Sequence, residues 1–142
     1  MPLTNFGSIL NFAEELEKTD QAFYDIVSQN LNCSEYKEMS EQFAADAKKN
    51  IKTVLRTRRE NVTEMILEPI KDFTRASFQE NFVGADKMNA QDAIDTARRL
   101  EQRAESYYLE ASEKIKALSE VSRALKLIAK KHTAHLKKLE SV

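Results

Sequence analysis

The sequence is poor in the residues that form turns and covalent cross-links. Its 142 residues include two glycines, two prolines, one cysteine and no tryptophan. An all-β chain of this length would need more turn residues, so this composition argues against a sheet fold. The single cysteine, Cys33, excludes an internal disulfide and fits a reducing compartment. We expect it to be an unpaired thiol, at the surface or half-buried in a turn.

Two further absences limit where the protein acts and what it binds. The 22 basic and 23 acidic side chains are interleaved along the chain and nearly cancel, which argues against nucleic acid as a partner. No apolar run approaches the ~20 residues of a membrane span, and the N-terminus lacks the basic region and apolar run of a signal peptide. We therefore expect a cytoplasmic protein without a membrane segment, folded as a single domain over residues 1–142.

Long amphipathic stretches dominate what is present. Charged residues make up 32% of the chain and hydrophobic residues 42%, a balance typical of helices with one apolar face. Apolar residues recur at helical spacing in four segments. The predicted helices cover about residues 5–31, 33–67, 89–119 and 122–139. Asn32 followed by Glu35 has the spacing of a capping box at the start of the second helix. Asn89, with Asp92 in the first turn, marks the start of the third.

The connection between the second and third helices is long and apolar. It carries Phe73, Phe78 and Phe82 between Glu68 and Met88, and a solvated linker would not carry three phenylalanines. We expect a packed crossover there, whereas the other two connections are short. The sequence therefore predicts an all-α four-helix bundle made of two helical hairpins joined by a long crossover.

The only two histidines, His132 and His135, lie where a packing helix should carry leucine or isoleucine. The apolar stripe of the last predicted helix consists of Val121, Leu125, Ile128, His132, His135 and Leu139. A spacing of three residues puts both imidazoles on one side of the helix, close to each other. Glu17 and Glu101 fall on the apolar sides of the first and third helices. Two imidazoles and two carboxylates are thus expected to face the interior of the bundle.

An internal repeat relates the two halves of the chain. AEELEKTDQAFY (13–24) aligns with ARRLEQRAESYY (97–108), and ADAKKNI (45–51) aligns with KKHTAHL (130–136). The offsets of the two alignments differ by one residue, as a single loop insertion would give. The alignments pair Glu17 with Glu101, Ala47 with His132, and Asn50 with His135.

This pattern resembles the ferritin-like superfamily and, within it, the rubrerythrin-like proteins. The family pattern consists of A-x-x-x-E, an aromatic pair six and seven residues later, and a partner helix bearing E-x-x-H, all in duplicate, and this chain matches it in part. Outside the crossover, the resemblance covers about Phe6 to Leu139. It implies a bundle that holds two irons, oxidase or peroxidase chemistry on dioxygen or hydrogen peroxide, and side-by-side pairing of bundles into a dimer.

Three of the six ligand positions depart from the family pattern. Glu17 and Glu101 match the glutamates of the first and third helices, and His135 matches the histidine of the last E-x-x-H. The departures are His132 in place of the glutamate of that motif, and Ala47 and Asn50 in place of the pair on the second helix. The resemblance therefore implies an altered metal site rather than an intact bridged di-iron centre.

Two interpretations of these residues stay open. In the first, Glu101, His132 and His135 form a facial triad on a divalent metal, or Glu17 joins them to close a tetrahedral site. Asp20 would then be an outer acceptor that fixes an imidazole tautomer. Iron is the expected ion, with zinc and manganese as alternatives, because the same ligands accept all three. Such a protein would be a metal carrier or an oxidoreductase.

In the second interpretation, no metal is bound and the inward polar groups satisfy one another. Glu17 would pair with His132, Glu101 with His135, and Asn50 would fill a gap. The protein would then be a non-catalytic helical bundle that serves as a self-associating interaction module. A misaligned repeat would instead leave these side chains apart. In either case we expect the tyrosines Tyr24, Tyr107 and Tyr108 to be core aromatics with hydroxyls in water.

Overall fold

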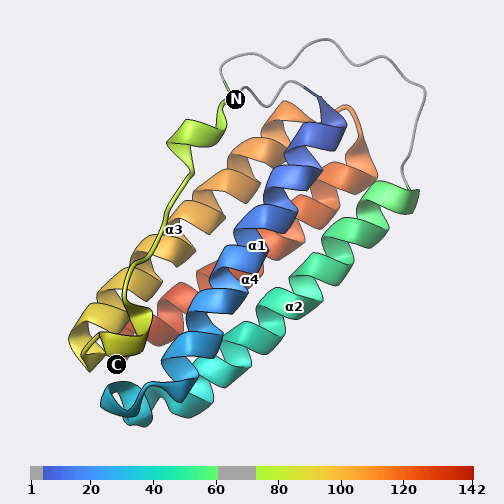
Figure 1. Ribbon diagram of the computed structural model, residues 1–142. Helices are drawn as coiled ribbons and strands as arrows, with labels where there is room; N and C mark the ends of the chain where they lie inside the picture. Colours follow the sequence, from blue (N-terminus) through green and yellow to red (C-terminus); the bar gives the residue numbers. More distant parts are fainter. Residues whose placement is uncertain (1–4, 61–72) are drawn as a thin grey trace.

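A computed structural model describes residues 5–60 and 73–142, which form four long helices packed side by side (Figure 1). The helices are α1 (Phe6–Gln29), α2 (Lys37–Glu60), α3 (Ala90–Lys114) and α4 (Ser119–Glu140). Helix α1 packs along α2, and α3 packs along α4, so the chain forms the two expected hairpins. These residues contain no β-strand, and none of their helices is long and apolar enough to cross a bilayer. The all-α class is confirmed.

The start of the second hairpin follows the prediction, but the start of α2 does not. Asn89 caps α3, and its side-chain oxygen accepts a hydrogen bond from the amide of Asp92 at 2.8 Å. The predicted cap at Asn32 is wrong, because residues 31–36 form the 3-10 helix η1 (Leu31–Tyr36) ahead of α2. Asn30 caps η1 instead and accepts from the amide of Asn32 at 2.9 Å. The Asn30 side chain is held in place because its amide nitrogen also donates to two carbonyls of the crossover.

The turn between α3 and α4 comes earlier than predicted. Helix α3 ends at Lys114 rather than near 119, and α4 begins at Ser119 rather than near 122. Ile115 leaves the helical conformation with φ −116° and ψ 22°. The Ser122 hydroxyl then donates to the Ser112 carbonyl at 2.9 Å and ties the two helices together. No glycine or proline marks this turn. The predicted end of the second helix near residue 67 lies outside the described residues.

The crossover is packed, as its phenylalanines predicted. Phe73 and Phe78 lie against Tyr107 with ring centroids 5.5 and 5.3 Å apart, and Phe82 lies against Phe23 at 5.2 Å. The crossover includes the short 3-10 helices η2 (Arg75–Ser77) and η3 (Ala85–Lys87). Its described part runs along the bundle beside α3 (Figure 1). The described part of the crossover therefore contributes buried side chains to the apolar core.

Two apolar clusters fill the ends of the bundle, and a polar layer separates them. On α1, residues 9–16 belong to one cluster and 23–27 to the other; on α3, residues 104–111 and 93–100 divide in the same way. Glu17 and Glu101 fall between the two clusters on their helices. Cys33 lies in the second cluster as an unpaired, fully buried thiol, so its expected surface or half-buried position was wrong.

Candidate metal centre

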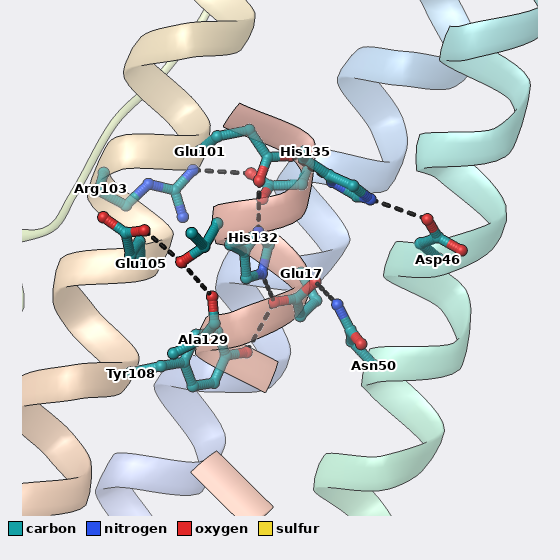
Figure 2. A network of polar contacts seen from close by, with 12 residues as sticks. Glu17, Asp46, Asn50, Glu101, Arg103, Glu105, Tyr108, Ala129, His132 and His135 are labelled. Atoms are coloured by element: carbon teal, nitrogen blue, oxygen red, sulfur yellow. Dashed lines mark hydrogen bonds and ion pairs between the residues drawn. The ribbon is translucent and has the colours of Figure 1, made fainter. Parts of the chain in front are cut away.

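The four predicted site residues converge in the polar layer. Glu17 comes from α1, Glu101 from α3, and His132 and His135 from consecutive turns of α4 (Figure 2). Their exposed fractions are 0%, 0%, 1% and 4%. All six residues of the predicted α4 stripe are buried as well. The inward direction of the stripes and the meeting of the four side chains are therefore confirmed.

His132 lies between the two glutamates. Its Nδ1 is 2.5 Å from Oε2 of Glu101, and its Nε2 is 2.8 Å from Oε2 of Glu17. The ring also stacks on Tyr108, with centroids 5.6 Å apart and planes at 13°. Burial lowers the pKa of His132, but the charges of Glu17 and Glu101 outweigh burial and raise this pKa well above its usual value. Without a metal, the ring is an imidazolium that donates to both carboxylates.

His135 also lies between two carboxylates. Its Nδ1 is 2.9 Å from Oε1 of Glu101, and its Nε2 is 2.8 Å from Oδ2 of Asp46 on α2. Phe43 covers one face of the ring at a centroid distance of 3.7 Å. The Asp46 side chain is 23% exposed, so it connects the buried cluster to the surface. Sequence reasoning missed Asp46, and its only signal was its place next to Ala47 in the repeat.

Both histidines thus use their ring nitrogens in the same way. Each turns Nδ1 to Glu101 and Nε2 to a second carboxylate, which is Glu17 for His132 and Asp46 for His135. Ligand atoms of Glu101, His132 and His135 lie within 4.8 Å of one another, close enough to hold one metal ion. Glu17 is near the same cluster but contacts the opposite nitrogen of His132.

The two glutamates are held in matching ways across the bundle. The Tyr24 hydroxyl on α1 donates to Glu101 on α3 at 2.8 Å, and the Tyr108 hydroxyl on α3 donates to Glu17 on α1 at 2.7 Å. Asn50 donates to Glu17 at 3.1 Å, in the position that His135 takes beside Glu101. The sequence repeat thus corresponds to an approximate twofold relation in space.

The tyrosine hydroxyls are buried rather than in water, so that part of the prediction was wrong. Burial raises the pKa of Tyr24 and of Tyr108 well above its usual value, and the neighbouring carboxylates raise it further. Both hydroxyls therefore keep their protons and remain donors. The third tyrosine, Tyr107, donates to the carbonyl of Ile9 at 2.6 Å. Each hydroxyl has an acceptor inside the protein because a buried, unpaired hydroxyl would be costly.

Asp20 was predicted to be an outer acceptor for an imidazole. In the structure it pairs with Arg103 instead. The guanidinium Nη2 of Arg103 lies 2.8 Å from Oδ1 of Asp20, and both side chains are buried. An aspartate one turn after Glu17 faces α3, and Arg103 brings a positive charge that compensates part of its cost of burial. Nothing in the sequence pattern distinguished Arg103 from a solvated arginine.

The buried charges of the layer are compensated by protons and by one arginine. Burial raises the pKa of Glu101, but His132 and His135 outweigh it and lower this pKa to about 2. Glu101 is therefore ionised. Burial raises the pKa of Asp20 to about 8, although the charge of Arg103 lowers it, so this carboxyl can hold a proton. The buried carboxyl groups are thus compensated by Arg103 and by protons within the layer, which a divalent ion could replace, since isolated buried charge is strongly unfavourable.

Comparison with protein-family models, with curated proteins and with solved structures found no match for this chain. The ferritin-like resemblance therefore depends on the residues of the sequence, and the function depends on the chemistry of the cluster.

Proposed function

We propose that this protein is a ferritin-like metal-binding protein that holds one divalent ion with Glu101, His132 and His135. The observation that carries the proposal is the common orientation of the two imidazoles. Each points Nδ1 at the same carboxylate, while an outer carboxylate accepts the Nε2–H. Carboxylate–histidine–metal arrangements of this kind fix the tautomer that leaves the ligating nitrogen free.

The donor set fits a divalent ion of the first transition row. Two neutral imidazoles and one carboxylate suit iron(II), zinc and manganese, and the family resemblance favours iron. Glu17 is not a ligand in this arrangement. It lies on the far side of His132 and accepts the Nε2–H at 2.8 Å. The ion would replace the protons that Glu101 shares with the two histidines, so the buried carboxylate would keep a compensating positive charge.

The proposed activity is oxidoreduction of dioxygen or peroxide. A bound divalent iron would supply open coordination positions for such a substrate. The chain's own residues orient and shield the site. Tyr24 fixes the orientation of the Glu101 carboxylate through a hydrogen bond of 2.8 Å, and the apolar clusters on both sides exclude water. Asp46 accepts a hydrogen bond from Nε2–H of His135 and is itself partly exposed to solvent.

Elemental analysis tests the ligand assignment. The protein is purified without chelator or nickel resin, and its metal content is compared with that of His132→Ala and His135→Ala. We expect stoichiometric metal in the parent protein and nearly complete loss in both variants, because each removes a ligand. Lys131→Ala, an exposed position on the same helix, is the matched control and should keep its metal. Unchanged metal in the histidine variants would overturn the assignment.

One observation supports a second candidate, a metal-free bundle that acts as a self-associating interaction module. Both ring nitrogens of each histidine, and both carboxylate oxygens of Glu17 and Glu101, already have hydrogen-bond partners. If the cluster is only structural, replacing Glu17 and His132 together by apolar residues should preserve or raise the melting temperature. A large loss of both stability and bound metal would exclude this candidate.

A further inference from the structure

The buried ion pair of Arg103 and Asp20 separates the metal cluster from a surface pocket. The pocket has a volume of about 210 Å³ and is lined by residues of α1, α3 and the crossover, including Thr19, Gln79 and Arg103. Arg103 thus contacts the pocket on one side and Asp20 on the other, although its side chain is only 7% exposed. Asp20, at 1% exposure, lies behind it.

Asp20 belongs to a second group of potential metal ligands. One ligand atom each of Glu17, Asp20 and His132 lies within 4.8 Å of the other two. The Oδ2 atom of Asp20 is buried without a hydrogen-bond partner, and so is Nε of Arg103. An unpaired buried carboxylate oxygen in such a group is a feature of a cation site, because a carboxylate in the interior needs a positive charge or a donor on each oxygen.

The guanidinium supplies that positive charge from within the chain. It contacts Oδ1 of Asp20 at 2.8 Å, and Asp20 belongs to the group with Glu17, whose carboxylate lies at Nε2 of His132, whereas the proposed ion binds at Nδ1. We propose that Arg103 is a built-in cation that excludes a second metal ion from the Glu17–Asp20 side of the cluster, and so limits the protein to one ion. The count of one ion rests on the proposed function, whereas the exclusion by Arg103 does not.

Electrostatics and access both support this role. A divalent cation that approached Asp20 through the pocket would meet the Arg103 charge first, and two like charges a few ångströms apart in a poorly solvated site repel strongly. Without the guanidinium, Glu17 and Asp20 would present two carboxylates to an ion, and the pocket would provide its route. The other charged residues that line the pocket, Glu15 and Glu80, are each paired with an arginine, Arg75 at 2.6 Å and Arg99 at 3.6 Å.

Titration of the metal-free full-length protein with Co²⁺ tests the proposal. Bound metal is measured by elemental analysis after desalting, and the new ligand field is followed by visible absorption. We expect one equivalent in the parent protein and in Arg103→Lys, which keeps a positive charge at this position. Arg103→Met and Arg103→Gln should bind two. The double variant Arg103→Met/Asp20→Asn should return to one, because the second ion loses a carboxylate.

The outcomes separate this inference from the proposed function. If the parent protein and Arg103→Met both bind one ion, the exclusion by Arg103 is wrong and the proposed site stands. If the parent binds none and Arg103→Met binds one, Arg103 excludes an ion as proposed, and the Glu101–His132–His135 site is wrong. Two ions in Arg103→Lys would also overturn the role of its charge. Arg103→Met should fold, because burial raises the pKa of Asp20 to about 8 and the carboxyl can take up a proton.

Discussion

The α1–α2 and α3–α4 hairpins have the same plan but bring different side chains to the centre. Helices α1 and α3 each supply a glutamate and, seven residues later, a tyrosine that bonds the glutamate of the other hairpin. Their partner helices differ. Helix α4 brings two imidazoles, whereas α2 brings Asn50 and, opposite His132, the methyl group of Ala47. The two glutamates are thus arranged symmetrically, whereas both imidazoles lie on one hairpin.

This difference shows that the two hairpins can carry different polar groups around one common core. The crosswise tyrosine bonds connect α1 to α3 and do not depend on what α2 or α4 carries. Asn50 stands where the repeat places His135 and donates to Glu17, so the carboxylate is satisfied although Asn50 offers no nitrogen ligand. The surroundings of the two glutamates thus match, while both imidazoles contact Glu101.

The largest expected effect comes from neutralising the two glutamates separately. Glu101→Gln removes the only carboxylate that faces both Nδ1 atoms, so metal affinity should fall by more than ~100-fold. Glu17→Gln removes an outer acceptor of His132, and affinity should fall by roughly 10–100-fold. Competition for zinc with a chromophoric chelator measures both. Equal losses in the two variants would mean that the ion lies symmetrically between the hairpins.

His135→Asn makes α4 resemble α2 at the paired position. The asparagine should still donate to Glu101, as Asn50 does to Glu17, but it supplies no imidazole. We expect metal affinity to fall by at least ~10-fold, while the metal-free protein loses only about 1–2 kcal/mol of stability. Asn50→Asp is the matched control on the other hairpin and should leave metal affinity nearer to the parent value. If His135→Asn keeps the metal affinity of the parent protein, His135 is not a ligand.

A pH series separates the two states of His132. Its raised pKa means that the imidazolium's contribution to folding is fully present below the ordinary pKa of 6.5 and is lost as the pH rises through the raised pKa. Metal binding has the opposite dependence, because it displaces protons and should strengthen by roughly tenfold per pH unit for each proton displaced. The metal-induced rise in melting temperature should therefore grow with pH. If the metal-induced rise in melting temperature is the same at every pH, metal binding releases no histidine proton.

Much of the bundle and the meeting of its ligands followed from periodicity in the sequence. The α4 stripe directed His132 and His135 inward because side chains three or four residues apart share a helix face. The capping asparagine at position 89 was recognisable because its function is local to one turn. The repeat placed Glu17 opposite Glu101. All of these are properties of one helix or of the register between two similar segments.

The residues that were missed depend on contacts between helices. Asp46 is half-buried beside the apolar stripe of α2, and only the packing of α4 gives it His135 as a partner. From the sequence alone, Arg103 is expected to be a solvated charge, and only the packing of α1 against α3 places Asp20 next to it. The turn after Ile115 uses an apolar residue and a serine bond in place of glycine or proline. Helical periodicity contains no information about such pairings.

The smallest expected effect distinguishes the two tyrosines. Tyr24→Phe and Tyr108→Phe each remove one buried hydrogen bond to a carboxylate, so each should cost the metal-free protein about 1.5–3 kcal/mol. The two hairpins should behave alike in this state. Tyr24→Phe should lower metal affinity several-fold because it acts on Glu101, a proposed ligand, and Tyr108→Phe should have the smaller effect because it acts on Glu17. Chemical denaturation with and without zinc measures both differences. If Tyr108→Phe lowers metal affinity more than Tyr24→Phe does, the ion binds on the Glu17 side of His132.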